Sequence, residues 1–132
     1  MIVTLTANPS LDRTATLERP LTRGDVHRVT SVTVEPGGKG INVARVAHYA
    51  GHPVRAILPA GQDDPILRGL DVLRVPYRVV PLREEVRTNL TLTEPDGTTT
   101  KINEPGPSLD AAAIERLAHL LVLESERADW VV

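Results

Sequence analysis

Apolar residues along the chain follow two spacings, one typical of buried strands and one typical of helices that pack on a sheet. Apolar runs at residues 2–7 and 54–58 predict two strands, and residues 39–50 between them predict a helix. Residues 65–73 have weaker helical spacing, and residues 77–82 predict another strand. Strands that alternate with helices predict an α/β sandwich with a mostly parallel sheet.

A longer helix is predicted over residues 110–126. Ser108 or Asp110 is the expected N-cap, because either side chain can accept a hydrogen bond from a free amide of the first turn. Apolar side chains recur at the i, i+3, i+6 and i+7 positions, which predicts that one face of this helix is buried. The residues expected on that face are Ile114, Leu117, Leu120 and Leu121.

The last residues, 128–132, include a short apolar run and predict the start of a buried strand. A strand at the end of a chain frays unless something covers it. Buried strands of parallel sheets are flanked by further elements, so we expect the chain to be part of a longer protein.

Two segments depart from the alternation of strands and helices. Residues 14–18 and 26–34 are rich in β-forming residues, with no helix between them. Residues 86–103 carry a Pro-Asp-Gly turn around Asp96 between two threonine-rich stretches, which is a hairpin signal. Together these segments predict a small antiparallel β layer beside the sandwich.

Pairing the predicted hairpin symmetrically about Asp96 sets its register. Asn89 then lies opposite Asn103, and Thr91 lies opposite Lys101. An ordinary solvated face is the simpler interpretation of this polar pattern, and an anion site beside it would favour binding instead. Because alternate side chains share a face, two cations and two amides are expected on one surface, namely Arg87, Asn89, Lys101 and Asn103.

The segment most suggestive of chemistry is the glycine-rich turn that opens the helix predicted over residues 39–50. Gly37, Gly38 and Gly40 let a ligand approach the backbone. The first helical amides have no intrahelical partner, and Lys39 adds a positive charge beside them. This combination predicts a site for a phosphorylated small molecule, and a plain tight turn that caps a helix is the alternative. The spacing matches neither a Walker A loop nor the dinucleotide-binding fingerprint.

Composition narrows the class of protein. The chain has 132 residues, of which 41% are apolar and 24% are charged, as is usual for one globular domain. Its net charge of −2 offers no basic field for nucleic acid, and no apolar run is long enough to cross a membrane. The absence of cysteine excludes disulfides and thiolate metal sites. With no secretory leader in the sequence, we expect a cytoplasmic protein.

A zinc site is a further candidate, since His48 and His52 are four residues apart and could share one helical face. Gly51 and Pro53 end the predicted helix at that point, however, and a histidine near a helix C-terminus is favoured by the helix dipole. We therefore expect ordinary helix-end residues here and no metal site.

Five short motifs follow one another along essentially the whole chain. They are Asn8-Pro9-Ser10-Leu11-Asp12, Gly37-Gly38-Lys39-Gly40-Ile41-Asn42-Val43-Ala44, Pro59-Ala60-Gly61, Arg87-Thr88-Asn89 and Lys101-Ile102-Asn103-Glu104-Pro105-Gly106. In this order they resemble the PfkB (ribokinase-like) carbohydrate kinases. Within that family the resemblance is greatest to the 1-phosphofructokinases, with the tagatose-6-phosphate kinases close by. Each motif is weak alone, and their shared order is the signal.

The resemblance implies a ribokinase-like three-layer α/β sandwich with a small antiparallel β-sheet lid that closes over the sugar. Residues 1–132 would then be the N-terminal portion of one kinase domain. The expected lid segments are approximately 12–35 and 86–103, and the expected core segments are approximately 1–11, 36–85 and 104–132.

The resemblance also implies a substrate. The expected reaction is ATP-dependent phosphorylation of a sugar phosphate, with fructose 1-phosphate giving fructose 1,6-bisphosphate. Asp12 is expected to accept hydrogen bonds from sugar hydroxyls, while Lys39, Arg87 and Lys101 hold the existing phosphate. The full set of expected substrate-binding residues is Asp12, Gly37, Gly38, Lys39, Asn42, Arg87, Asn89 and Lys101.

The catalytic half of the mechanism is not found in this sequence. The family's Gly-Ala-Gly-Asp motif, which carries the catalytic base, does not occur in it. We therefore expect no catalytic residue here, expect the main contacts to ATP and Mg²⁺ to lie elsewhere in a longer chain, and expect these 132 residues to be inactive alone. The alternatives are a tagatose-6-phosphate kinase, or a non-catalytic module that binds a sugar phosphate or forms a homodimer through the lid.

Overall fold

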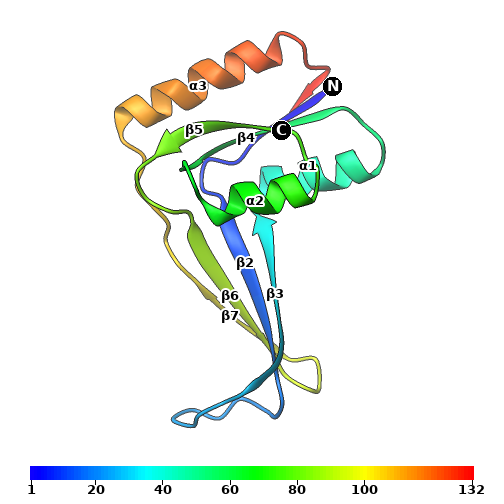
Figure 1. Ribbon diagram of the computed structural model, residues 1–132, viewed down its shortest axis with the longest axis vertical. Helices are drawn as coiled ribbons and strands as arrows, with labels where there is room; N and C mark the ends of the chain where they lie inside the picture. Colours follow the sequence, from blue (N-terminus) through cyan, green and yellow to red (C-terminus); the bar gives the residue numbers. More distant parts are fainter.

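The computed structural model describes all 132 residues, which form an α/β core and a β-sheet lid that projects from it (Figure 1). The core sheet has four parallel strands in the order β5-β4-β1-β8. These strands are β1 (Ile2–Leu5), β4 (Val54–Gly61), β5 (Tyr77–Leu82) and β8 (Trp130–Val131). The helices are α1 (Lys39–Tyr49), α2 (Pro65–Val72) and α3 (Ala111–Ser125).

The core has three layers, because α3 lies on one face of the parallel sheet and α1 and α2 lie on the other (Figure 1). All three helices predicted from the apolar spacing are present, within a few residues of the expected bounds. The α/β sandwich with a β-sheet lid that the sequence predicts is therefore confirmed. None of the three helices combines the length and the apolarity that crossing a lipid bilayer requires.

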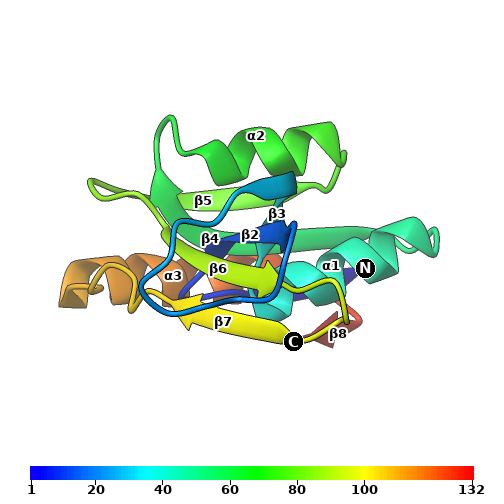
Figure 2. The same cartoon turned by 90° about the horizontal axis from the view of Figure 1, so that it is seen from below.

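The lid is a second four-stranded sheet, in the order β3-β2-β6-β7. Strands β2 and β3 form one antiparallel hairpin, and β6 and β7 form another, whereas β2 and β6 pair in parallel (Figure 2). The lid is thus a mixed sheet rather than a wholly antiparallel one, because both hairpins leave the same end of the core and their first strands run in the same direction. Its strands are β2 (Ser10–Leu17), β3 (Val29–Gly37), β6 (Arg87–Thr93) and β7 (Thr99–Asn103).

The register of the second hairpin agrees with the prediction from symmetric pairing about the turn. Asn89 pairs with Asn103, and Thr91 pairs with Lys101. These residues therefore share one face of the lid, as the alternation of side chains along a strand requires.

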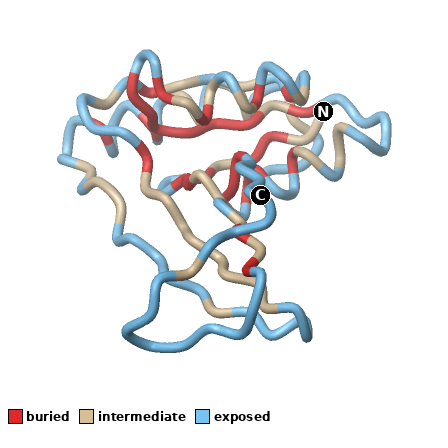
Figure 3. The backbone as a smooth tube through the Cα atoms, turned by 60° about the horizontal axis from the view of Figure 1, so that its bottom comes forward, coloured by how far each residue is buried: buried red, intermediate tan, exposed pale blue.

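Burial is concentrated in the core, and the lid strands are largely exposed or half-buried (Figure 3).

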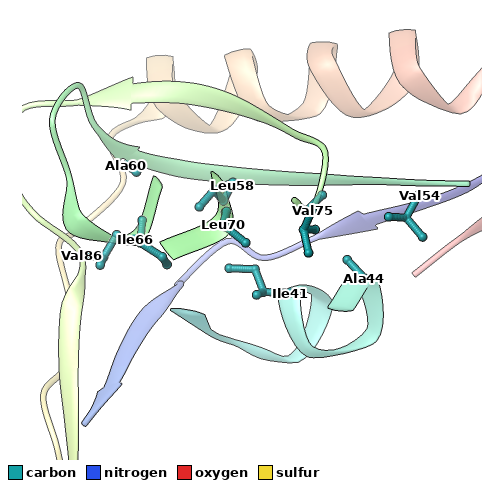
Figure 4. Close-up of a cluster of buried hydrophobic side chains, with 10 residues drawn as sticks. Ile41, Ala44, Val54, Leu58, Ala60, Ile66, Leu70, Val75 and Val86 are labelled. Atoms are coloured by element: carbon teal, nitrogen blue, oxygen red, sulfur yellow. The ribbon is translucent and has the colours of Figure 1, made fainter. Parts of the chain in front are cut away.

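Apolar contacts anchor the lid to the core at its base. The larger apolar cluster lies between the parallel sheet and helices α1 and α2, where Ile41, Leu58 and Leu70 are fully buried (Figure 4). Val86, immediately before β6, belongs to this cluster, and Leu11 of β2 packs against it. Each outgoing lid strand therefore begins from a side chain fixed in the core.

Helix α3 buries a narrower face than the sequence predicts. Leu117 is 4% exposed and belongs to the apolar cluster on that face of the sheet, but Ile114 is 54% exposed. Ala113 takes the inward position instead, at 1% exposed, so the expectation that Ile114 is buried is wrong. The cap is Asp110, whose carboxylate accepts a hydrogen bond from the Ala113 amide at 2.6 Å.

Strand β8 lies at the open edge of the core sheet. It pairs in parallel with β1, but Trp130 is 71% exposed and Val131 is 49% exposed. The strand is therefore exposed, whereas the sequence predicts a buried one. No element covers its side chains. The N-terminal ammonium of Met1 forms an ion pair with Asp129 just before this strand, and that contact lowers the pKa of the Asp129 carboxyl below its ordinary value.

Truncation of the two α3 side chains tests this packing. We expect Leu117→Ala to lower the free energy of unfolding by about 2–5 kcal/mol, because it leaves a cavity beneath the helix. Ile114→Ala in the same helix is the matched control, and it should change that free energy by less than about 0.5 kcal/mol. Urea denaturation measures both values, and equal losses would contradict the observed orientation of α3.

Candidate functional site

A small cleft lies where β1 ends, α1 begins and the lid joins the core. Its volume is about 290 Å³. Two cationic side chains, Lys39 of α1 and Arg87 of β6, lie on its wall. Eight residues line it, namely Leu5, Thr6, Ala7, Asn8, Gly38, Lys39, Gly40 and Arg87.

The glycines of the turn allow α1 to start against β1. Gly38 is the N-cap of α1 and has φ of +117°, a conformation that L side chains rarely adopt. A Cβ atom at Gly40 would lie 2.5 Å from the Leu5 carbonyl oxygen, so only glycine fits there without moving backbone. The Thr6 hydroxyl accepts a hydrogen bond from the Ile41 amide at 2.9 Å and fixes the first turn of the helix.

This arrangement suits an anion. Amides in the first turn of a helix have no intrahelical acceptor, and the helix dipole adds partial positive charge at the same end. Lys39 is exposed beside them, so its ammonium can reach a ligand in the cleft. Free donors and a cation therefore lie around one cleft, which is the arrangement that an anion-binding site needs.

Arg87 supplies the second cation from the lid. One of its terminal nitrogens, Nη1, donates to the Glu104 carbonyl at 3.4 Å, and its Nε is buried with no partner. Buried polar groups are nearly always hydrogen-bonded, but the burial of this Nε leaves no space for a ligand atom against it. The Arg87 residue as a whole lies on the cleft wall, and guanidinium groups bind phosphate oxygens at short, charge-assisted distances.

A second group of predicted site residues adjoins the cleft on the same face of the lid. The Asp12 carboxylate accepts hydrogen bonds through Oδ1 from the Ser10 hydroxyl at 2.8 Å and from the Asn89 amide at 3.0 Å. A Cβ atom at Gly37 would overlap the Asp12 carboxylate. Glycine at position 37 therefore leaves the space that the Asp12 side chain occupies.

The structure brings some of the predicted residues together and leaves others apart. Gly38, Lys39 and Arg87 share the cleft, whereas Lys101 lies farther along the lid and is exposed. Asn42 is exposed on α1 and lines a separate apolar surface groove that also includes Val46. His48 remains within α1 and His52 lies beyond its end, and no group of three or more metal-ligating side chains occurs in the molecule.

Two residues of the site were not assigned a role from the sequence. Thr6 caps the first turn of α1, and Asn8 lines the cleft while its Nδ2 donates to the Pro105 carbonyl at 3.0 Å. Asn8 belongs to the motif that opens the family resemblance, so a signal for it was present. Nothing in the sequence marks Thr6, because its contact depends on how β1 and α1 pack.

Comparison with known proteins identifies the family. Residues 5–128 match the model of the pfkB family of carbohydrate kinases. The chain belongs to this family. It is 36% identical to the ATP-dependent 6-phosphofructokinase isozyme 2 of Mycobacterium tuberculosis, over 99% of this chain and 39% of that protein. It is also 38% identical to the 1-phosphofructokinase of Xanthomonas campestris, over 92% of this chain and 39% of that protein.

A solved structure of the family has the same fold. Phosphofructokinase-2 of Escherichia coli in complex with fructose-6-phosphate superposes with a TM-score of 0.86 at 30% identity, over 92% of this chain and 41% of that one. The three-layer core with its lid is therefore the architecture of pfkB-family kinases. The chain spans 39–41% of the length of these three relatives.

Gly37 and Asp12 provide a double-mutant test of the site. We expect Gly37→Ala to lower the free energy of unfolding by about 1–3 kcal/mol, because the new methyl group overlaps the Asp12 carboxylate. In an Asp12→Ala background the overlap is gone, so the same change should cost much less. Chemical denaturation of the parent and the three variants gives the coupling energy. Equal costs in both backgrounds would show that the two residues do not meet.

Proposed function

We propose that these residues form the sugar-phosphate half of the active site of a pfkB-family kinase, and that fructose 1-phosphate is the substrate that this half holds. The observation that carries the proposal is the cleft in which Lys39 and Arg87 face the N-terminus of α1. The relatives act on the same class of compound, since their names include both 1-phosphofructokinase and 6-phosphofructokinase. A tagatose-6-phosphate kinase remains the alternative within the family.

The phosphate already on the sugar is bound by the cations and amides of the cleft. Lys39 contributes a flexible point charge, and Arg87 contributes a planar fork of donors. Lys101 lies on the same lid face and adds a third positive charge as the lid closes. Gly38 also lines the cleft and completes the contacts proposed at this end of α1, whereas Asn42 lies outside the cleft and is not among them. Each well-formed hydrogen bond to the phosphate is worth about 1.5–3 kcal/mol of binding free energy.

The sugar itself is recognised from the lid. The Asp12 carboxylate accepts hydrogen bonds from sugar hydroxyls, and these are shorter and stronger than bonds to a neutral acceptor. Asn89 lies beside Asp12 on the neighbouring strand and completes the polar surface. Closure of the lid excludes water, which otherwise competes as an acceptor of the phosphoryl group and weakens every charged contact.

The other substrate is ATP with Mg²⁺, as is usual for the family. The 132 residues contain no cluster of carboxylates or histidines suited to a metal ion, so we assign no Mg²⁺ ligand among them. We likewise assign no catalytic base and no ATP contact within this chain. Phosphoryl transfer is therefore proposed for the longer protein, and the chain alone should release no ADP from ATP.

Binding of the sugar phosphate tests the site directly. We expect fructose 1-phosphate to bind the chain more tightly than fructose 6-phosphate or tagatose 6-phosphate in calorimetric titrations. Arg87→Gln and Lys39→Ala should each weaken that binding by about tenfold, since a loss of about 1.4 kcal/mol is a factor of ten.

Arg83→Gln is the matched control for the arginine change. Arg83 is exposed and lies outside the cleft, so this substitution should leave the dissociation constant unchanged. Equal effects of the two arginine substitutions would mean that general charge, and not the cleft, holds the ligand. Unchanged affinity in both cleft variants would remove the site assignment.

A homodimer through the lid is the second proposal. The face of the lid opposite to Asp12 exposes apolar side chains, with Val32 at 40%, Val34 at 51% and Ile102 at 56% exposed. Strand register puts these residues on one face together with Leu90. Pairing two such faces removes the apolar area from water, which is the usual driving force for association.

A charge on this face should abolish the dimer. We expect Ile102→Glu to shift the chain to monomers in analytical ultracentrifugation, because the residue opposite is Leu90 and an unpaired carboxylate is costly to bury. Val122→Glu on α3 is the control, since Val122 is 63% exposed on a different element. A parent chain that is monomeric at all concentrations would reject the dimer without affecting the sugar site.

A further inference from the structure

Parallel pairing of β2 with β6 assembles a compact polar group on the substrate-facing side of the lid. Ser10 lies beside Arg87, and Asp12 lies beside Asn89. Side chains two residues apart on a strand share a face, so all four belong to one surface. Ser10 is only 1% exposed, and its hydroxyl is committed to an acceptor within the protein.

Both neighbours of Asp12 donate to the same carboxylate oxygen. The Ser10 hydroxyl lies 2.8 Å from Oδ1, and Asn89 Nδ2 lies 3.0 Å from Oδ1. The amide must present its nitrogen here, because its carbonyl oxygen would face a carboxylate. No protein donor bonds to Oδ2, which lies against the Cβ-free side of Gly37.

Glu35 is a second carboxylate near Asp12, and it forms an ion pair with Arg45. Glu35 lies directly opposite Asp12 on β3, where two like charges are unfavourable. Its Oε1 forms an ion pair with Arg45 Nη2 at 3.1 Å, and Arg45 Nη1 also donates to the Pro36 carbonyl at 3.0 Å. One oxygen of Glu35 is thus taken by Arg45, whereas Asp12 Oδ2 accepts no hydrogen bond from the protein.

We infer that Ser10 and Asn89 are positioning residues, which hold the Asp12 carboxylate by Oδ1 so that Oδ2 is presented to a sugar hydroxyl. The inference rests on the proposed function, in which Asp12 binds the sugar. It assigns Ser10 a part in substrate recognition without contact to the substrate, and it gives Asn89 a task carried out through Asp12.

The energetics of Asn89 favour this role over a purely structural one. Its Nδ2 is used by Asp12, but its Oδ1 is buried with no partner, and an unsatisfied buried acceptor destabilises a fold. An apolar residue at this position would avoid that cost. An aspartate side chain without fixed donors can sample more than one χ1 rotamer, and each rotamer points its carboxylate in a different direction. Holding it in advance reduces the ordering cost of binding.

The binding test uses the 132-residue chain with fructose 1-phosphate and, separately, inorganic phosphate as probes. Ser10→Ala and Asn89→Asp should each weaken fructose 1-phosphate binding by about five- to tenfold, a loss of about 1–1.4 kcal/mol. Binding of inorganic phosphate to Ser10→Ala should stay unchanged, because the cleft cations are intact and no charge is added. Ser31→Ala is the matched control, since Ser31 is an exposed serine of the same lid face with no contact to Asp12.

A second measurement decides the inference without any ligand. Three-bond NMR couplings of Asp12 report its side-chain torsion in the free chain, and they should indicate a single rotamer in the parent and in Ser31→Ala. Ser10→Ala and Asn89→Asp should give averaged values. Circular dichroism of each variant confirms that the fold is retained.

The outcomes separate this inference from the proposed function. A parent that fails to bind fructose 1-phosphate rejects the proposed function, and the couplings still decide whether Ser10 and Asn89 hold Asp12. A parent that binds, with Ser10→Ala and Asn89→Asp equal to it in affinity, overturns the positioning role and leaves the sugar site in place. Averaged Asp12 couplings in the parent overturn it as well.

Discussion

The candidate site depends on one pairing, the parallel ladder between β2 and β6. These strands belong to hairpins far apart in sequence, and the Asp12–Asn89 contact spans 77 residues. Without the ladder, Asp12 and Ser10 would lie on one ribbon and Arg87 and Asn89 on another. With it, a carboxylate, two hydrogen-bond donors and a cation occupy adjacent positions on one face. The chemistry of the lid is therefore a property of the sheet and not of either hairpin.

A second constraint connects this face to the core. The segment from the end of β3 to the first turn of α1 approaches β1 and the base of β2 so closely that neither Gly37 nor Gly40 could carry a Cβ atom. Gly37 leaves room for the Asp12 carboxylate, and Gly40 leaves room for the Leu5 carbonyl. The same closeness brings the free amides of α1 beside the lid. Both the packing of α1 and the proposed ligand binding therefore require residues without side chains in this segment. This explains why three of the four residues 37–40 are glycine.

The sequence predicts most of the fold, because local signals suffice for it. The periods of apolar residues indicate the helices and core strands, and the Pro-Asp-Gly turn at residues 95–97 sets the hairpin register. The parallel pairing of the two hairpins was not predictable in this way, since no local pattern encodes which hairpin edges meet. The exposure of Ile114 was missed for a similar reason, because spacing marks an apolar stripe but does not show that the neighbouring Ala113 takes the inward position. The family resemblance supplied the list of site residues, and the structure separates those that share the cleft from Asn42 and Lys101.

Strand β1 pairs with two segments that lie far apart along the chain, and this has a consequence for how the core sheet assembles. Its neighbour on one side is β4, and its neighbour on the other side is β8, which lies more than twice as far along the chain. Pairings between distant segments carry a loop-closure entropy and slow the folding of a domain. Strand β1 therefore gains its second neighbour only after β8 has been made. Until then one edge of β1 stays open to pairing with other chains.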